Sequence, residues 1–474
     1  MKAGDRGQAE GCIPGAMKPL TRYQWFAGTI LAVGLVATCT QGGATLVTLA
    51  SFNGTNGANP EAELLQGADG TFYGTTAFGG AYGYGTVFQM APSGGLTTLV
   101  WFNGTNGANP RAGLVLGTDG NLYGTTYAGG VGGDGLVFGV TTNGGLATLA
   151  QFTGTNGIYP KSGLLRANDG SLYGTTVVGG TNGHGTIYQI TTNGALVTLV
   201  SFDSSGYSPY AGLVQGTGGD FYGTTFQGGT NGHGTVFKAT TNGELAYLHS
   251  FSGSGDGGNP YGGLVQGTDG VLYGSTFFGG TNNCGTIFKL TTNGALTTLA
   301  AFNGTNGAYP QAALLLAADG NLYGTTTAGG AYTNQSGSGY GTLFMLKLGG
   351  TLTTLVSFNG TNGASPQAGL VQGTDGSFYG TTAYGGANGS GSLFRLTLAP
   401  PAPPVLQATQ TGGALALSWS AAAGEQYQVQ YKTDLNASGW SNLRSAVTAT
   451  NVAMTVLDTI GPDLLRFYRV LLLP

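Results

Sequence analysis

Several side chains that commonly bind metals recur at equivalent places in this sequence. A glycine-rich segment returns about every 50 residues, and its copies carry just before their last glycine Tyr84, Asp134, His184, His233, Cys284, Tyr340 and Ser390. Aspartate, histidine and cysteine are the usual zinc ligands, but they must meet within a few ångströms of the metal. Equivalent positions in neighbouring copies of a stacked sheet lie roughly 10 Å apart. We therefore expect no metal site.

Paired carboxylates are the second chemistry that the sequence offers. Glu61 and Glu63 lie two residues apart at the start of an apolar run, and in a strand both would point to the same face. A glycosidase needs two carboxyl groups at a defined separation, so this pair is the best enzymatic candidate, although a solvated strand entry explains it as well. No nucleophile elbow, phosphate loop or metalloprotease motif is present. The sequence therefore predicts no catalytic residue and no cofactor.

Aromatic side chains make a binding surface the more favoured interpretation. Rings among Gly, Asn and Thr provide flat apolar platforms beside short hydrogen-bonding groups, which suit sugars and extended peptides. The candidates for binding in the glycine-rich segments are Tyr84, Tyr127, Asp134, His184, His233 and Tyr340. Further rings in these segments are Phe78, Tyr82, Phe226, Phe277, Phe278, Tyr332 and Tyr384, and the junctions between repeats add Tyr159, Tyr207, Tyr210, Tyr261 and Tyr309. Packing of the rings within the loops is the alternative.

These residues are carried by a repeat whose clearest mark is the stretch FNGTNGANP. Its phenylalanine returns at Phe52, Phe102, Phe152, Phe202, Phe251, Phe302 and Phe358, and a period of about 50 residues is typical of propeller blades. In the second copy, short apolar runs at 112–116, 122–126, 136–141 and 146–152 predict four strands. Asp-Gly and Asn-Gly between them predict hairpins with type I′ turns. Seven such copies predict a seven-bladed β-propeller.

The two ends of the repeat region predict how the ring closes. The seventh copy has three strands, ending at 392–398, and then reaches Pro400 and Pro401. The missing strand is found before the first copy, where Ala44 to Leu49 matches the fourth strand of the others. This N-terminal strand is expected to complete the last blade and so remove an exposed sheet edge.

The chain outside the propeller at 44–398 divides into three parts. Residues 1–43 contain a basic stretch from Met17, which is the alternative start, and an apolar stretch at 25–38, as in a secretory signal peptide. Cleavage in 38–44 is favoured over lipidation of Cys39. Residues 399–404 are a proline-rich linker, and 405–474 show the strict alternation of half-buried strands. With its ALSWS, QYQVQY and RFYRV stretches, this last part resembles a fibronectin type III β-sandwich.

The consensus GLVxGTDGxLYGTTxxGGxxGxGTxFxxTTNGxLTTLxxF over residues 44–398 resembles the GloVer tandem repeat of secreted bacterial proteins. This resemblance implies a secreted or cell-surface location. We therefore expect an all-β exported protein that acts as a binding or adhesion module, for carbohydrate or protein at the cell surface. A mainly structural surface protein is the alternative, and a polysaccharide-acting enzyme is the third reading.

Composition narrows the partners further. Only 7% of residues are charged and the net charge is −4, so a nucleic-acid partner has no electrostatic support. No apolar span follows the leader, so we expect no transmembrane anchor after cleavage. Because few charges are available to be screened, binding is expected to depend little on salt.

Overall fold

A computed structural model describes residues 38–41, 43–399, 406–411, 414–421, 426–434, 436, 439–449, 453–459 and 466–473. The predicted leader before Thr38 and most of the proline-rich linker lie outside the described residues. The chain divides into two compact units, with the boundary between Leu398 and Ala399. Within the described residues there is no helix long and apolar enough to cross a membrane.

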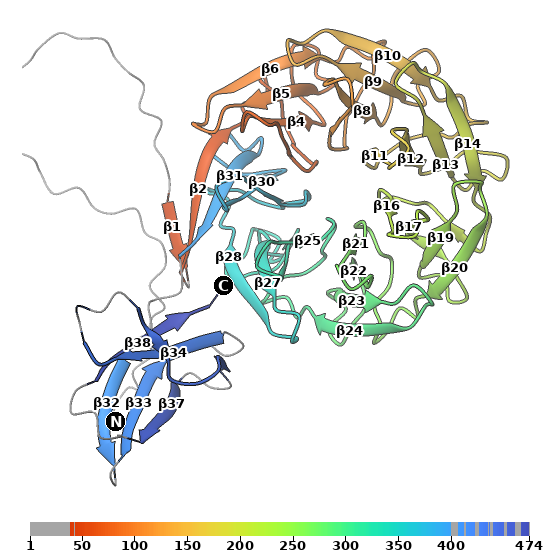
Figure 1. Ribbon diagram of the computed structural model, residues 1–474. Helices are drawn as coiled ribbons and strands as arrows, with labels where there is room; N and C mark the ends of the chain where they lie inside the picture. Colours follow the sequence, from red (N-terminus) through yellow and green to blue (C-terminus); the bar gives the residue numbers. More distant parts are fainter. Residues whose placement is uncertain are drawn as a thin grey trace, which may run out of the picture. The chain divides into compact units, whose positions relative to one another are not determined.

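The first unit is a ring of seven antiparallel sheets (Figure 1). The first four blades, from the innermost strand outward, are β3 (Leu65–Gln66), β4 (Phe72–Thr76), β5 (Thr86–Met90) and β6 (Leu96–Trp101); β7 (Val115–Leu116), β8 (Leu122–Thr126), β9 (Leu136–Val140) and β10 (Leu146–Gln151); β11 (Leu165–Arg166), β12 (Leu172–Thr176), β13 (Thr186–Ile190) and β14 (Leu196–Ser201); and β16 (Val214–Gln215), β17 (Phe221–Thr225), β19 (Thr235–Ala239) and β20 (Leu245–Ser250).

The remaining three blades repeat this plan. They are β21 (Val265–Gln266), β22 (Leu272–Thr276), β23 (Thr286–Leu290) and β24 (Leu296–Ala301); β25 (Leu315–Leu316), β26 (Leu322–Thr326), β27 (Thr342–Leu346) and β28 (Leu352–Ser357); and β29 (Val371–Gln372), β30 (Phe378–Thr382), β31 (Ser392–Leu398) and β2 (Ala44–Ser51). A small separate ladder joins β15 (Gly206–Tyr207) to β18 (Gln227–Gly228) in the fourth blade. The part of the chain that the structure describes up to Leu398 is thus an all-β propeller.

The ring closes between the two ends of the repeat region, as predicted. Strand β2 pairs antiparallel with β31, from Ala44 opposite Leu398 to Ser51 opposite Ser392. The hydroxyl of Thr381 also donates a hydrogen bond to the carbonyl of Pro60, 3.2 Å away. One feature was not predicted: β1 (Thr38–Gln41) adds a further strand on the outer side of β2. Backbone hydrogen bonds therefore join the last blade to the start of the chain.

The phenylalanine of the nine-residue motif holds neighbouring blades together. All seven copies are at most 1% exposed. Phe102, for example, lies in the junction after β6. Its ring centre is 5.2 Å from that of Phe138 in the second blade, and it packs with Tyr73 and Val87 of the first blade. Such full burial of a phenylalanine contributes about 1.5–3 kcal/mol. The motif therefore recurs because the contact between blades recurs.

The hairpin turns differ from the predicted type. A type I′ turn needs two residues with positive φ, whereas in the turn of the second blade only Gly120 has one, at 80°. The amide of Gly117 donates to the carbonyl of Asn121, 2.8 Å away. This is a three-residue loop in which the glycine supplies the left-handed step. The carboxylate of Asp119 accepts hydrogen bonds from the Asn121 amide and the Tyr123 hydroxyl, so the aspartate fastens the turn to the sheet.

The second unit contains two further antiparallel sheets. One has the order β32 (Leu406–Thr411), β33 (Ala414–Ser420) and β37 (Ala453–Thr459); in the other, β34 (Gln426–Lys432) pairs with β35 (Ser441–Asn442), β36 (Val447–Thr448) and β38 (Phe467–Leu472). Leu417 and Trp419 from the first sheet share a buried cluster with Tyr427 and Val429 from the second. The alternating apolar residues thus form the strands that the sequence predicts, and the fibronectin type III resemblance stays a prediction.

Candidate functional site

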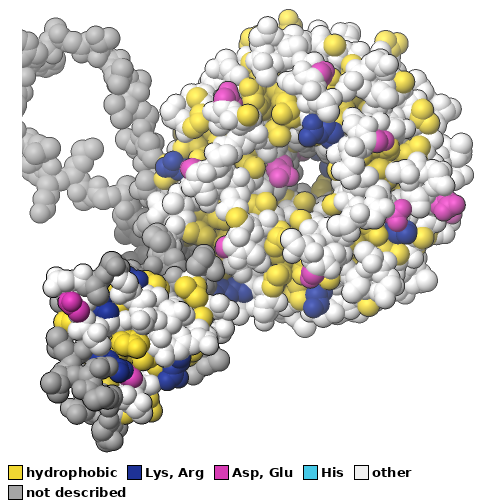
Figure 2. All heavy atoms as spheres, viewed as in Figure 1, with side chains coloured by type: hydrophobic (Ala, Val, Ile, Leu, Met, Phe, Trp, Pro, Cys, Tyr) yellow, Lys and Arg dark blue, Asp and Glu magenta, His cyan; other side chains and the backbone are white. Residues whose placement is uncertain are grey.

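One position in every repeat faces the axis of the ring. It directly follows the proline of the junction, and the seven residues there are Glu61, Arg111, Lys161, Tyr210, Tyr261, Gln311 and Gln367. All seven line a single central cavity of about 710 Å³, which continues along the innermost strands to Gln66 and Gln372. Figure 2 shows acidic and basic side chains beside the central opening. A cavity of this volume is in the range of ligand-binding pockets.

The backbone before the proline aims this position at the axis. The residue that precedes the proline has a positive φ of 49° to 61° in all seven junctions. Its amide donates to a carbonyl of the preceding blade, as Asn109 does to Tyr84 at 2.8 Å. Such a left-handed step turns the chain sharply, and the proline then restricts the next φ. The scaffold is therefore repeated seven times while the side chain after the proline varies.

The carbonyls that accept these amide hydrogen bonds belong to the residues singled out as metal-ligand and binding candidates. They are Tyr84, Asp134, His184, His233, Cys284, Tyr340 and Ser390. The contact between blades uses the backbone carbonyl of these residues, so it does not depend on the type of side chain. The rings of Tyr84, His233 and Tyr340 pack on the glycines of the next junction, and the His184 ring lies 5.1 Å from Tyr207. Of the six predicted binding residues none lines the central cavity.

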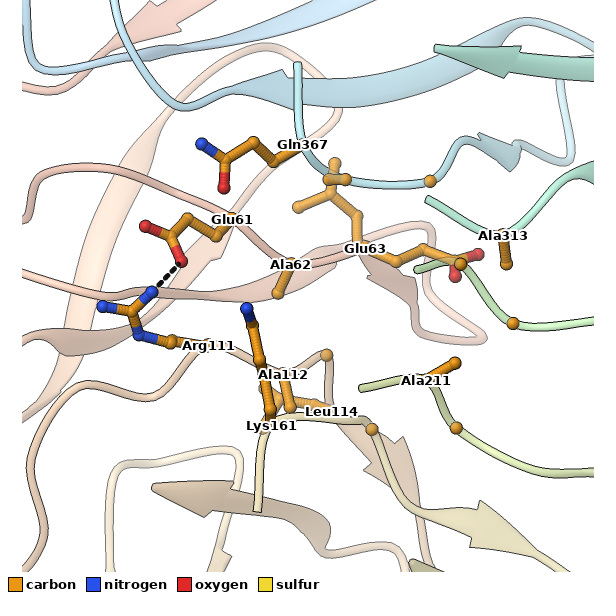
Figure 3. Close-up of a pocket in the computed structure, with 18 of the residues that line it drawn as sticks. Glu61, Ala62, Glu63, Arg111, Ala112, Leu114, Lys161, Ala211, Ala313 and Gln367 are labelled. Atoms are coloured by element: carbon orange, nitrogen blue, oxygen red, sulfur yellow. Dashed lines mark hydrogen bonds and ion pairs between the residues drawn. The ribbon is translucent and has the colours of Figure 1, made fainter. Parts of the chain in front are cut away.

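The seven residues after the prolines form the mouth of the cavity. An ion pair occupies one side of this mouth. The Nη1 of Arg111 donates to Oε2 of Glu61 at 3.2 Å, and the Glu61 side chain is only 9% exposed (Figure 3). Desolvation raises the pKa of Glu61, while Arg111 and Lys161 act in the opposite direction. The Arg111 guanidinium lies 5.1 Å from the ring centre of Tyr127 and 5.7 Å from that of Phe78. Its Nε is buried and has no hydrogen-bond partner.

A second cation, Lys161, lies beside this pair. Its Nζ is 4.6 Å from the ring centre of Tyr210 and 4.3 Å from that of Tyr261, and it donates a hydrogen bond to the Tyr261 hydroxyl. Desolvation and the nearby Arg111 lower the pKa of Lys161 to about 8. The two aromatic faces favour the ammonium form, but they do not remove the repulsion between the two cations.

The carboxylate pair expected at Glu61 and Glu63 does not form. The first strand begins only at Leu65, so the alternation of a strand does not apply to these residues. Figure 3 shows the Glu61 carboxylate directed toward Arg111 and the Glu63 carboxylate directed away from it, toward Ala313. Glu61 is also ion-paired and largely buried, contrary to the expected solvated strand entry.

Glu63 lies alone in the lumen. Because protein surrounds the cavity, the Glu63 carboxylate is partly desolvated, and this raises the pKa of Glu63 to about 7. Glu63 is nevertheless an exposed residue, which limits the desolvation. The residues equivalent to Glu63 in the other six repeats are all glycine or alanine. This carboxyl group is therefore a single feature of the first blade.

Partly exposed rings lie in the loops of the second, fourth and fifth blades and in the junctions that follow the second to fifth blades. We call them the aromatic belt. The belt consists of Tyr127, Tyr159, Tyr210, Phe226, Tyr261, Phe277, Phe278 and Tyr309. Stacked pairs recur in it: Tyr127 on Tyr159 at 4.8 Å, Tyr210 on Tyr261 at 5.0 Å and Phe277 on Tyr309 at 5.1 Å. The rings pack on one another and keep part of their surface exposed, and the binding role predicted for them stays a prediction.

Sequence reasoning missed the ring of residues after the proline. It considered Glu61 and Glu63 only as a pair with each other and did not weigh Arg111, Lys161, Gln311 or Gln367. The fold instead collects Glu61, Glu63, Arg111 and Lys161 in one cavity. A charged ligand bound there would be sensitive to salt, unlike the binding expected from the low overall charge. Comparison of the seven repeats with one another could have found the site, since this position varies while proline precedes it in every copy. Among the described residues, no group of three or more His, Cys, Asp and Glu could hold a metal ion.

Several solved structures are similar to this chain. A putative 6-phosphogluconolactonase from Bacteroides fragilis aligns with 21% identity and a TM-score of 0.47, over 70% of this chain and 95% of its own. The BP39L lectin from Burkholderia pseudomallei aligns with 10% identity and a TM-score of 0.45, over 71% of this chain and 99% of its own. No curated protein matches the chain.

A repeat family accounts for most of the sequence. The Gloeobacter/Verrucomicrobia repeat matches in three overlapping stretches, at residues 27–225, 133–336 and 208–439. These stretches include the whole propeller and all seven junctions. The chain therefore belongs to the Gloeobacter/Verrucomicrobia repeat family.

Proposed function

We propose that this protein is an exported binding module whose propeller takes a glycan chain at the central cavity. The observation that carries the proposal is the residue after each junction proline. The seven copies of this position line one cavity. Their side chains differ from repeat to repeat, whereas the proline before them is the same in every repeat. A purely structural position would need no such variety around a single lumen.

The chemistry of the cavity mouth favours a sugar. Tyr210 and Tyr261 offer aromatic surface, and Gln311 and Gln367 offer amide donors and acceptors in the next two blades around the ring. Sugar rings combine apolar faces with many hydroxyl groups, so they suit a site with both kinds of partner. The aromatic belt extends the apolar surface beyond the cavity, which favours a polymer over a single small molecule.

The proposed activity is binding without turnover. The two carboxylates of the cavity point away from each other, and Glu61 is held by Arg111. This arrangement is unlike the facing acid and base or nucleophile that glycoside hydrolysis needs. The proposed site of action is outside the cytoplasm, because a basic and then apolar leader precedes the propeller. We also propose that 405–474 form a fibronectin type III-like module.

The test is a binding screen with full-length mature protein. Immobilised neutral and acidic polysaccharides serve as probes, and affinity is measured by titration calorimetry for those that retain the protein. Tyr261→Ala should weaken binding by about 1–3 kcal/mol if the ring is an anchor, and Gln311→Ala should weaken it as well. Asp119→Ala, in a hairpin turn, is the control and should lower thermal stability more than affinity.

Three results would count against the proposal. Retention that survives both cavity substitutions would place binding elsewhere. Self-association with no retained polysaccharide would favour the structural alternative. Release of reducing ends from a retained polymer would favour an enzyme.

A further inference from the structure

We propose that the central cavity selects an acidic sugar, with Arg111 and Lys161 holding the carboxylate of a uronic acid residue in the polymer. This inference rests on the proposed function and names its ligand class.

The first step is the uneven distribution of charge around the mouth. The seven residues after the prolines run in ring order as Glu, Arg, Lys, Tyr, Tyr, Gln and Gln. The charged side chains thus occupy three adjacent blades, and the neutral ones occupy the other four. A ligand that crosses the mouth meets ions at one end and only aromatic and amide groups at the other. Such a site suits a molecule whose own charge lies at one edge.

The second step is the excess of positive charge in this sector. Arg111 is close enough to lower the pKa of Lys161, and Glu61 is the one carboxylate among the three residues. The Arg111–Glu61 contact uses one guanidinium nitrogen, Nη1. Nε is buried, so the second terminal nitrogen, Nη2, with its two N–H groups is the part of the fork left for a ligand. The ammonium of Lys161 has three donors, and a tyrosine hydroxyl accepts one of them. Donors and net positive charge are therefore left for an anion.

The third step is the position of the other carboxylate. Glu63 faces the lumen on the side of Ala313, away from Arg111 (Figure 3). An anion deeper in the lumen would meet this group without a cation beside it. An anion at the mouth would instead lie between Arg111 and Lys161. The arrangement thus directs a carboxylate to the mouth rather than to the channel.

The fourth step separates a uronic acid from a simple anion. A carboxylate held by Arg111 and Lys161 brings the attached ring toward Tyr210 and Tyr261, which are the next residues around the mouth. Arginine and carboxylate match each other in planar shape. Hydroxyl groups on the far side of the sugar then face the amides of Gln311 and Gln367. A free inorganic anion would leave these four side chains without a role.

The experiment compares polymers that differ only in charge. Polygalacturonate, alginate and hyaluronan are titrated against the mature protein, each beside its carboxyl-reduced neutral form, and dextran sulfate serves as a polyanion without uronic acid. We expect at least one uronate polymer to bind about tenfold or more tightly than its reduced form, the range expected when a charge-assisted hydrogen bond is lost. Lys161→Met and Arg111→Gln should remove this preference and keep the weaker neutral binding.

Two further variants guard the interpretation. Lys161→Arg keeps the positive charge and should keep the preference, while Lys289→Met removes a lysine of strand β23 outside the cavity and should change nothing. Melting curves check that each variant is folded. Equal binding of charged and reduced polymers would overturn the inference and leave the proposed function standing. Equal binding of dextran sulfate, or a preference that survives Lys161→Met and Arg111→Gln in folded protein, would also overturn it. Failure of every polymer in this set and in the wider screen would instead overturn the proposed function.

Discussion

The side chain of Asn109 donates a hydrogen bond to the backbone carbonyl of Ala77, 2.9 Å away in the preceding blade. Asn59 and Asn259 make the same contact with Ala383 and Phe226. Asparagine tolerates the left-handed backbone of this position, so it satisfies both the φ angle and the contact between blades. Four junctions depart from this solution, two with a serine, Ser208 and Ser365, and two with a tyrosine. Tyr159 and Tyr309 have φ values of 59° and 61°, and each stacks on an aromatic ring of the belt.

A bulky residue with positive φ costs about 1–3 kcal/mol, so these tyrosines suggest that stability is given up for binding. Tyr159→Asn should relieve the strain and allow the side-chain hydrogen bond that the three asparagine junctions make. We expect the free energy of unfolding to rise by about 1 kcal/mol while affinity for the glycan falls. Chemical denaturation and calorimetry measure the two effects. Tyr384→Asn is the control, since this tyrosine is exposed and has no positive φ. A loss of stability in Tyr159→Asn would contradict this reading.

The carboxyl group of Glu63 predicts a pH-dependent stability. Its pKa is raised from 4.5 in a free side chain to about 7 in the folded protein. The folded state therefore keeps a proton that the unfolded chain releases, and the free energy of unfolding falls as the pH rises from about 4.5 to about 7. Glu63→Gln removes this loss. The variant should melt at a higher temperature than the wild type at pH 8 and at the same temperature at pH 4.

The size of this effect is limited because Glu63 is exposed, so we expect less than about 1 kcal/mol at pH 8. Glu244→Gln is the matched control, because Glu244 is an exposed glutamate at a turn, and it should not shift the melting temperature in the same way. A Glu63→Gln protein that melts lower than the wild type at pH 8 would show that the carboxylate is stabilising.

The amine of Lys161 predicts a pH-dependent affinity for an acidic glycan. Its pKa is about 8 in the free protein, and a bound carboxylate should raise it. The complex then holds a proton that the free protein loses, so affinity should fall as the pH rises above about 8. The charged and titratable groups that face the amine are Glu61, Arg111, Tyr210 and Tyr261. Titrations between pH 7 and pH 9 stay below the usual range of tyrosine. Lys161→Arg should bind with little pH dependence, and an unchanged pH profile in this variant would assign the effect to another group.

Closure of the ring predicts that the N-terminal strand is needed for stability. A mature chain that begins at Phe52 lacks β1 and β2, so β31 becomes an exposed edge strand. We expect a lower melting temperature and concentration-dependent aggregation, followed by calorimetry and light scattering. The matched control ends the chain at Ala399, which removes the second compact unit and should leave the melting of the propeller unchanged. Equal melting of both truncated proteins would contradict the role of β2.

Most of the scaffold could be predicted from the sequence. The period of about 50 residues, the four apolar runs and the unmatched strand at Ala44 predict the blades and the closure, because alternation and turn residues are local properties of the chain. The turn type was wrong for a local reason as well. Asp119 serves as a hydrogen-bond acceptor with an ordinary φ, and only Gly120 adopts the left-handed conformation.

The candidate site was decided by the tertiary structure. Glu61, Arg111 and Lys161 are each about 50 residues apart in the sequence, and nothing in their local surroundings indicates that they meet. Each lies after a junction whose left-handed residue and proline turn the chain toward the axis, and the closed ring brings all seven turns to one point. The repeat specifies the direction of each side chain. Closure of the ring decides which side chains share a cavity, because only the complete circle of blades places them within reach of one ligand.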